Sequence, residues 1–173
     1  MKETEFSFET CIDQEEHAMQ IMNWRNDPTT LEQFYHHEPK NWETFWPEYR
    51  KEYLVASPRP VFARLKGARV AFLRFNLVSH PRNLPGLAVD ISINVAPEAR
   101  GKGIGTRVLV AIQGHLKSLG AVAIVAEVRQ ANTPSLKVFR KAGFEDLGIA
   151  DITVPDTGEK IAICRFVCQL NGQ

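Results

Sequence analysis

A short run of glycines and cations, Arg100-Gly101-Lys102-Gly103-Ile104-Gly105, carries the clearest chemical signal in the sequence. Glycines let a backbone turn with its N–H groups pointing inward, and they leave room for a ligand to approach closely. An apolar run precedes the segment and a helical pattern follows it, so the positive end of a new helix is expected there. These features predict an anion-binding loop, to which Arg100 and Lys102 add full charges.

Two better-known phosphate loops do not fit this segment. A P-loop requires a hydroxyl residue after its lysine, whereas Lys102 is followed by Gly103. A dinucleotide-binding fingerprint requires a third glycine where the chain has Thr106, and no strand-helix-strand repeat begins the chain. By itself, the loop is equally compatible with a glycine-rich turn that carries two solvated cations.

The flanks of the loop predict a strand, a helix and a second strand. Residues 87–95 are rich in β-branched side chains, and Pro97 removes a ladder donor and ends that strand. Residues 104–119 carry one apolar stripe at helical spacing, and Gly120 closes the helix. Residues 121–128 form an apolar run that suits a buried strand parallel to the first.

Other periodic segments predict further elements on both sides of this unit. Asp13 is a candidate N-cap for the first helix, and Asp27-Pro28 is expected to end it. The architecture expected from the pattern is a mixed sheet flanked by helices. Helices are expected at 13–25, 41–53 and 134–142, and hairpins at 61–77 and 146–170.

Composition and charge limit the possible functions. A chain of 173 residues suits one domain, and a formal net charge of +1 argues against a general nucleic-acid or membrane-surface binder. The first residues lack the apolar core of a signal peptide, and no apolar run approaches the roughly 18 residues that span a bilayer. A cytoplasmic location with no membrane partner is therefore expected.

No metal site is predicted from the cysteines and histidines. Cys11, Cys164 and Cys168 are sparse and lack zinc-like spacing, which suits a reducing compartment. The pair His36-His37 has no Cys, Asp or Glu partner at ligand spacing, so a surface loop is expected there.

The segment from 89 to 148 resembles the GCN5-related N-acetyltransferase superfamily in three separated elements. Residues 95–105 contain the arginine of its acyl-CoA loop, followed by a glycine three residues later and a second glycine two residues after that. Glu127-Val128-Arg129, followed by Asn132 and Ser135, resembles its next strand and helix start. Phe139-Arg140-Lys141-Ala142-Gly143-Phe144 resembles its closing helix and turn.

The resemblance implies an α/β (α+β) fold in one domain over residues 1–173. Its central twisted sheet would be mixed, mostly antiparallel and splayed between two parallel strands, with helices on both faces. Residues 87–148 would form the acyl-CoA core, with acetyl-CoA as cosubstrate and the pantetheine arm paired with the backbone of 93–95. The implied acyl-CoA-binding residues are Ile93, Asn94, Val95, Arg100, Gly101, Lys102, Gly103, Ile104, Gly105, Thr106, Asn132, Ser135 and Phe139.

The chemistry that the resemblance implies is direct attack of a primary amine on a thioester. An alkylamine with a pKa near ~10.4 is mostly protonated at neutral pH, so a base has to help. Glu127 is the first candidate, although a solvated carboxylate paired with Arg129 is an equal alternative, and Asp90 on the preceding strand is the second candidate. Many members carry Tyr where this chain has Phe139, which cannot protonate the departing thiolate.

The N-terminal half is expected to bind the acceptor. Its Trp24-Arg25-Asn26-Asp27 resembles a segment in two branches, one that acetylates nucleotide-linked amino sugars and one that acetylates protein N-termini. The chain lacks an acidic excess that would attract basic protein tails, so the amino sugar is favoured, with Trp24, Arg25 and Asn26 as contacts. A buried anchor and a helix-end cation are the structural alternatives for Trp24 and Arg25. A non-catalytic acyl-CoA-binding module stays open, and a monomer or homodimer is expected.

Overall fold

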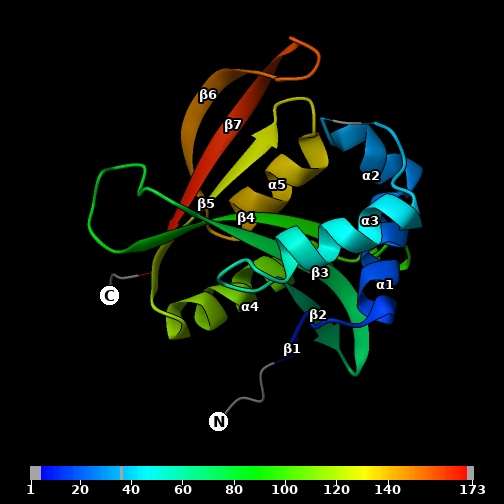
Figure 1. Ribbon diagram of the computed structural model, residues 1–173. Coiled ribbons are helices and arrows are strands. Elements are labelled where there is room, and N and C mark those ends of the chain that lie inside the picture. The colour runs from blue at the N-terminus through cyan, green and yellow to red at the C-terminus, as the bar shows by residue number, and fades with distance from the viewer. Residues whose placement is uncertain (1–4, 36, 171–173) are drawn as a thin grey trace.

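The computed structural model describes residues 5–35 and 37–170, which contain one seven-stranded sheet with helices on both faces (Figure 1). In chain order the elements are β1 Phe6–Thr10, α1 Glu15–Arg25, α2 Pro28–Gln33, α3 Trp42–Glu48, the π-helical turn η1 Tyr49–Tyr53, β2 Val61–Leu65, β3 Ala68–Val78, β4 Leu87–Val95, the 3-10 turn η2 Pro97–Ala99, α4 Ile104–Ser118, β5 Ala121–Arg129, α5 Thr133–Lys141, β6 Glu145–Thr153 and β7 Lys160–Gln169. No helix in these two ranges is long and apolar enough to cross a membrane.

The sheet is mixed, with the strand order β1-β2-β3-β4-β5-β7-β6. Every neighbouring pair is antiparallel except β4 and β5, which run parallel at the centre. The helix α4 makes the crossover that a parallel pair requires. The expected mixed and mostly antiparallel sheet is therefore confirmed.

The two parallel strands separate part-way along their length. Their pairing ends where Asp90 lies opposite Val125. Past this point β4 stays paired with β3 as far as Val95, and β5 stays paired with β7 as far as Arg129. Because each strand has another neighbour to hold it, the two diverge while both remain in the sheet. The expected splay is confirmed, and it creates an open wedge in the middle of the fold.

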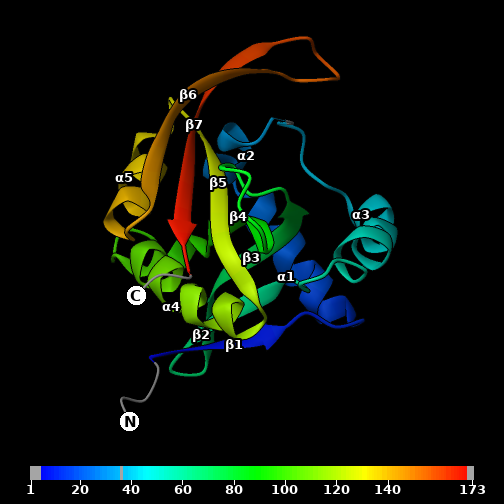
Figure 2. The same ribbon diagram turned by 90° about the vertical axis from the view of Figure 1, so that its left-hand side faces the viewer.

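Helices cover both faces of the sheet. Figure 2 shows α4 and α5 on one side of the sheet and α1, α2 and α3 on the other. The predicted apolar stripe of α4 is fully buried at Val108, Leu109, Ile112 and Leu116. The helix begins after Gly103, whose φ of 73° is a left-handed conformation that glycine adopts without a Cβ clash.

The N-terminal segment differs from expectation at three points. The strand β1 was not expected, because five residues are too few for a clear alternation signal. The N-cap of α1 is Gln14, and no capping bond is made by a side chain, so the interpretation of Asp13 as the cap was wrong. Asp27-Pro28 does more than end α1, because it also begins α2. There, Asp27 accepts from the backbone N–H of Thr30 at 3.2 Å and Pro28 takes the first helical position.

The predicted helix over 41–53 consists of two parts, α3 and the π-helical turn η1. Its aromatic residues Phe45, Tyr49 and Tyr53 are fully buried, and Tyr53 stacks against Phe72 of β3 with ring centroids 6.1 Å apart. These rings anchor α3 and η1 to the sheet face on which α1 and α2 also lie.

Candidate functional site

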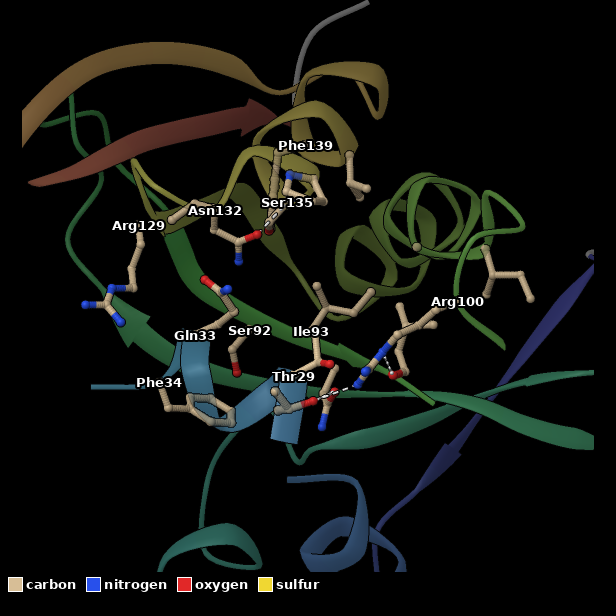
Figure 3. A pocket seen from close by; sticks show the side chains of 18 of the residues that line it. Thr29, Gln33, Phe34, Ser92, Ile93, Arg100, Arg129, Asn132, Ser135 and Phe139 are labelled. Atoms are coloured by element: carbon tan, nitrogen blue, oxygen red, sulfur yellow. Dashed lines mark hydrogen bonds between the residues drawn. The ribbon is translucent and has the colours of Figure 1, made fainter. Parts of the chain in front are cut away.

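A cleft of about 610 Å³ lies in the wedge between β4 and β5. Figure 3 shows Gln33 and Phe34 on one side of it and Asn132, Ser135 and Phe139 on the other. The glycine loop and the start of α4 close one end. Of the residues predicted to act at a site, those that line this cleft are Ile93, Asn94, Val95, Arg100, Gly101, Gly103, Ile104, Gly105, Glu127, Asn132, Ser135 and Phe139.

The wall formed by β4 has an unpaired backbone edge. Among the described residues this strand has no ladder partner on its β5 side beyond Asp90, while its other edge is paired with β3 from Ala88 to Val95. A strand edge with free N–H and C=O groups pairs readily with an extended molecule that carries amides. The segment 91–95 is therefore suited to such a ligand, and the family resemblance implied this pairing for 93–95.

The glycine loop provides an anion cradle at the end of this edge. Gly101 and Gly103 both have a φ of 73°, and a Cβ added at either position would meet no protein atom within 4 Å. Gly103 is followed directly by α4, whose first turn contains no acidic residue. The free N–H groups and the dipole of α4 therefore suit a phosphate group, and the glycines keep the approach open.

Gly105 has a different role in the loop. A Cβ at this position would lie 3.4 Å from side-chain carbons of both Val95 and Val138. A glycine here lets the first turn of α4 pack closely against the end of β4 and against α5. Its place in the motif is thus explained by packing between elements.

Arg100 is not a free cation in this structure. Its guanidinium donates to Asp27 Oδ2 at 2.7 Å and to Thr30 Oγ1 at 2.6 Å, while its Nε donates to the Val95 carbonyl at 3.2 Å. The hydrogen bond from Arg100 lowers the pKa of the Asp27 carboxyl, and the Thr30 backbone N–H lowers it further. Arg100 therefore joins the glycine loop to α2, a partnership that sequence spacing did not indicate.

Lys102 and Thr106 lie outside the lining of the cleft as far as the described residues show it. The Lys102 ammonium donates to the Glu98 carbonyl at 3.3 Å on the exposed side of the loop. The anion cradle therefore depends on backbone groups more than on the two side-chain cations. For both residues a role in ligand binding stays a prediction.

Two carboxylates lie on the same sheet face at the closed end of the wedge, but Asp90 is not among the residues that line the cleft. Asp90 is opposite Val125, and Glu127 follows two residues later on β5, so alternation places both acids on one side. Burial raises the pKa of Asp90 to about 7, and the negative charge of Glu127 adds to the rise. Glu127 lines the cleft, but its side chain is 43% exposed and lies 3.3 Å from Arg165 Nε.

These surroundings reverse the expected order of the two acids. The pKa of Asp90 is raised toward neutral pH, and a carboxyl with such a pKa is suited to proton transfer at ordinary pH. Glu127 has a cation partner, although this partner is Arg165 and not Arg129. The guanidinium of Arg129 instead donates to the Glu32 carbonyl at 3.2 Å.

Phe139 forms part of the cleft wall opposite α2. It is 3% exposed, it stacks on Phe166 with centroids 5.7 Å apart, and it meets Phe144 edge to face at 5.1 Å. Its ring is fixed by this packing and offers no proton. Tyr35 provides a phenol in the described lining, and burial followed by the charge of Glu127 raises its pKa.

The three residues predicted to bind an acceptor have different surroundings. Trp24 is 5% exposed and meets Phe62 edge to face, and the Asn26 amide exchanges two 2.7 Å hydrogen bonds with the Lys40 backbone. Both therefore serve as scaffold. Arg25 donates to the Tyr53 hydroxyl and lies 4.8 Å above the ring of Phe34, which lines the cleft.

Sequence reasoning passed over Arg74, which lies on β3 directly opposite the cleft residue Ser92. A lone arginine within the apolar run 70–75 was a signal that could have been used. Within the described ranges, no group of three or more His, Cys, Asp or Glu side chains is placed to hold a metal ion. The free cysteines at 11, 164 and 168 are all buried, and His36 lies outside the described residues.

Most of the chain, residues 18–144, matches the family model described as Acetyltransferase (GNAT) family. The chain belongs to the GNAT family. The match includes most of α1, all of α2, the splayed strands and the glycine loop, and every residue that lines the cleft lies within it. The resemblance drawn from three short motifs is thereby confirmed.

Individual GNAT relatives differ in the acceptors that their names state. A mycothiol acetyltransferase of Pseudarthrobacter chlorophenolicus is 34% identical over 80 residues, which are 45% of this chain and 24% of that protein. An L-methionine sulfoximine/L-methionine sulfone acetyltransferase of Pseudomonas aeruginosa is 32% identical over 72 residues, covering 42% and 40% of the two chains. The matched segments thus span less than half the length of these curated relatives.

The fold also matches a solved GNAT structure over nearly its whole length. AAC(6')-Ib in complex with paromomycin and acetyl-CoA has a TM-score of 0.74, with 18% identity, 95% of this chain covered and 93% of that chain. At this identity the likeness establishes the fold. The likeness does not show which acceptor this chain uses.

Replacing Asp27 with alanine tests the link between α2 and the glycine loop. The change removes both the N-cap of α2 and the ion pair with Arg100, so we expect the free energy of unfolding to fall by about 1–2 kcal/mol. Asp13→Ala is the matched control, because Asp13 and its partner Arg50 are both more than half exposed, and its expected effect is below about 0.5 kcal/mol. Urea denaturation measures both, and equal losses would contradict the proposed link.

Proposed function

We propose that this GNAT protein transfers an acetyl group from acetyl-CoA to a small primary amine, with Asp90 as the base. One observation supports this more than any other: a single wedge joins an anion cradle and an unpaired strand edge, and a carboxyl with a pKa of about 7 lies beside its closed end. Acetyl-CoA has the matching chemistry in the same order, because it carries a pyrophosphate, an arm with two amides and a thioester.

The residues of the cleft suit the parts of acetyl-CoA as follows. The backbone of 101–105 and the N-terminus of α4 would bind the pyrophosphate, and the open edge of 91–95 would pair with the pantetheine amides. Asn132 caps α5 by accepting from the Ser135 N–H at 3.3 Å, which holds the opposite wall in place. The arm would thus be guided toward the closed end of the wedge.

We assign the base to Asp90 because it lies where β4 and β5 separate, next to Ile91 in the lining of the cleft. The amine attacks the thioester carbonyl, a C–N bond forms, the C–S bond breaks, and the ammonium proton passes to Asp90 directly or through water. A carboxyl with a raised pKa accepts this proton more readily than an ordinary carboxyl, and it is still ionised above pH 7. Glu127 contributes a negative charge that raises the proton affinity of Asp90 and attracts the cationic amine.

The leaving thiolate needs no tyrosine at the position of Phe139. Coenzyme A thiol should resemble a cysteine thiol with a pKa of ~8.5, so departure of the thiolate is not prohibitive. Water or the proton released by the amine completes the reaction. Because Phe139 is locked by ring packing, it acts as an apolar wall for the arm.

The first acceptor that we propose is the amino group of a nucleotide-linked sugar. Gln33, Phe34 and Tyr35 give the acceptor side of the cleft one amide and two aromatic rings, which suit a polar ring with hydroxyl groups. A protein N-terminus is the second candidate, and a non-catalytic acyl-CoA-binding module is the third. The cytoplasmic location and the monomeric or dimeric state stay predictions.

A panel of amines tests the function. Release of free thiol from acetyl-CoA is measured with nucleotide-linked amino sugars, free amino sugars, amino acids and N-terminal peptides. We expect at least one small amine to give thiol release well above hydrolysis. Tight acetyl-CoA binding with no release for any acceptor would instead support the binding module.

Gly103→Val tests the anion cradle. The valine side chain would enter the space over the loop and crowd the phosphates, so we expect acetyl-CoA affinity measured by calorimetry to fall at least about tenfold. Gly67→Val is the matched control, because Gly67 has a φ of 84° and is similarly free of neighbours, but it lies in the hairpin turn between β2 and β3. A general loss of folding caused by a side chain at a left-handed position would weaken binding in both variants, whereas the cradle assignment requires a loss in Gly103→Val only.

Asp90→Asn tests the base. For the wild type we expect kcat/KM to rise with pH around an apparent pKa near 7, and for the variant we expect a fall of about 100-fold or more with that limb lost. Glu127→Gln should lower kcat more than acetyl-CoA affinity, but by less than Asp90→Asn does. Full activity in Asp90→Asn would remove Asp90 from this role.

A stability measurement separates lost chemistry from lost folding in this variant. The folded state raises the pKa of Asp90 above its unfolded value near ~3.9, so it binds more protons between about pH 4 and 7 and loses stability as the pH rises through that window. Asp90→Asn removes this penalty. Its free energy of unfolding at pH 8 should therefore exceed that of the wild type by up to about 4 kcal/mol.

A further inference from the structure

Two buried side-chain donors beside the cleft have no hydrogen-bond acceptor. Within the described residues, the buried side-chain nitrogen and oxygen atoms that lack a partner are Arg74 Nε and Asn94 Nδ2. Both lie on the sheet face that carries Asp90, because Arg74 is directly opposite Ser92 and Asn94 follows Ser92 by two residues on β4. Buried donors are almost always paired, so two neighbouring exceptions point to an acceptor that the described residues do not supply.

The amide oxygen of Asn94 contacts α2. Thr30 Oγ1 accepts from Arg100 at 2.6 Å and lies 3.4 Å from Asn94 Oδ1. The carbonyl side of the amide is thereby turned toward α2, and the NH₂ group is left for another partner. Ser92, between the two unpaired donors, is exposed and lines the cleft.

The positive charge at this place is also poorly matched. The Arg74 guanidinium lies 3.9 Å above the ring of Tyr53, and its carboxylate contact is Glu52 Oε2 at 3.9 Å on a side chain that is 61% exposed. Arg25 donates to the hydroxyl of the same Tyr53, and no carboxylate of the described chain lies within ion-pair distance of it. By contrast, Arg100 has a carboxylate oxygen at 2.7 Å.

We propose that the acceptor carries an anionic group, a carboxylate or a phosphate, near its reactive amine, and that Arg74, Ser92 and Asn94 bind this group. The proposal rests on the proposed function, since it names the class of acceptor for the same cleft. A guanidinium, a hydroxyl and an amide NH₂ can all donate to the oxygens of one anion, and the guanidinium can do so with two parallel bonds. Both side chains with unpaired donors are partly exposed, so a small rotation brings each donor to the ligand.

The spacing of charges along β4 favours an acceptor whose amine and anionic group lie close together. Asp90 precedes Ser92 by two residues, which is about 6.6 Å along a strand. The negative end of the cleft at Asp90 and Glu127 would thus receive the amine while the anion contacts Arg74. An acceptor without an anionic group leaves the buried donors unpaired, and it is therefore disfavoured. An acceptor with several positive charges is also disfavoured, because it places like charge against Arg74.

Matched pairs of acceptors distinguish the two sources of such an anion. One arm compares L-methionine sulfone with its α-carboxamide, and the other compares glucosamine 1-phosphate with glucosamine. Each pair is assayed by thiol release from acetyl-CoA. We expect kcat/KM to be about ten- to a hundredfold higher for the anionic member of at least one pair. A difference in the first pair indicates that the anionic group is a carboxylate, and a difference in the second pair indicates a phosphate.

Variants show whether the preference comes from this place on the sheet. In Arg74→Gln the ratio within that pair should fall close to one through a higher KM for the anionic acceptor, with the KM for acetyl-CoA unchanged. Arg74→Lys should keep part of the preference because it keeps the charge. Arg82→Gln is the control, since Arg82 pairs with Glu145 outside the cleft and should leave the ratio as it is.

Asn94→Asp gives a second test that does not depend on the stability of the Arg74 variants. A carboxylate of nearly the same size at this position would repel the anion, so the same ratio should fall. Thermal unfolding of each variant shows that the protein is folded in the assay.

The outcomes separate this inference from the proposed function. Equal or better turnover of the neutral members, unaffected by Arg74→Gln, would overturn the inference and leave the acetyltransferase function standing. If no amine is acetylated, calorimetry with the CoA-saturated protein decides. Tighter binding of an anionic member that is lost in Arg74→Gln would support the inference while the function fails, and equal or absent binding would overturn it.

Discussion

The separation of β4 and β5 after Asp90 is the feature on which the rest of the site depends. Parallel strands normally continue their ladder, but here each strand is held on its far side by an antiparallel neighbour, β3 or β7, to the end of its length. The fold can therefore leave one edge of β4 unpaired without losing the strand. That single gap provides the space of the cleft, the free backbone groups along its wall and a closed end where Asp90 is partly removed from water.

A second constraint is the contact between α2 and the glycine loop. Asp27, Thr30 and Arg100 join the helix on the acceptor side to the loop that would bind phosphates, and Thr30 extends this network to Asn94. One set of hydrogen bonds thereby fixes the position of α2 relative to the glycine loop. This explains how a helix of six residues without a buried side chain keeps a defined place over the sheet.

Groups of different charge lie at different places around the cleft. Backbone dipoles lie at the mouth, two carboxylates lie at the closed end, and two arginines around Tyr53 lie on the acceptor side. The net charge of the chain is only +1, so these local fields are not visible in the composition. They arise because alternation along β3, β4 and β5 places Arg74, Asp90 and Glu127 on one face of the sheet.

Local patterns in the sequence determined a large part of this protein. The glycine run, the bounds of β4 and the stripe of α4 follow from backbone conformation and apolar spacing, which nearby residues decide, and the GNAT resemblance followed from them. Only the tertiary structure decided that Arg100 binds Asp27, 73 residues away, that burial raises the pKa of Asp90, and that Arg74 and Asn94 keep donors without a partner among the described residues. Charge pairing and desolvation depend on which residues meet across the sheet, and that meeting is set by the register of strands far apart in the chain.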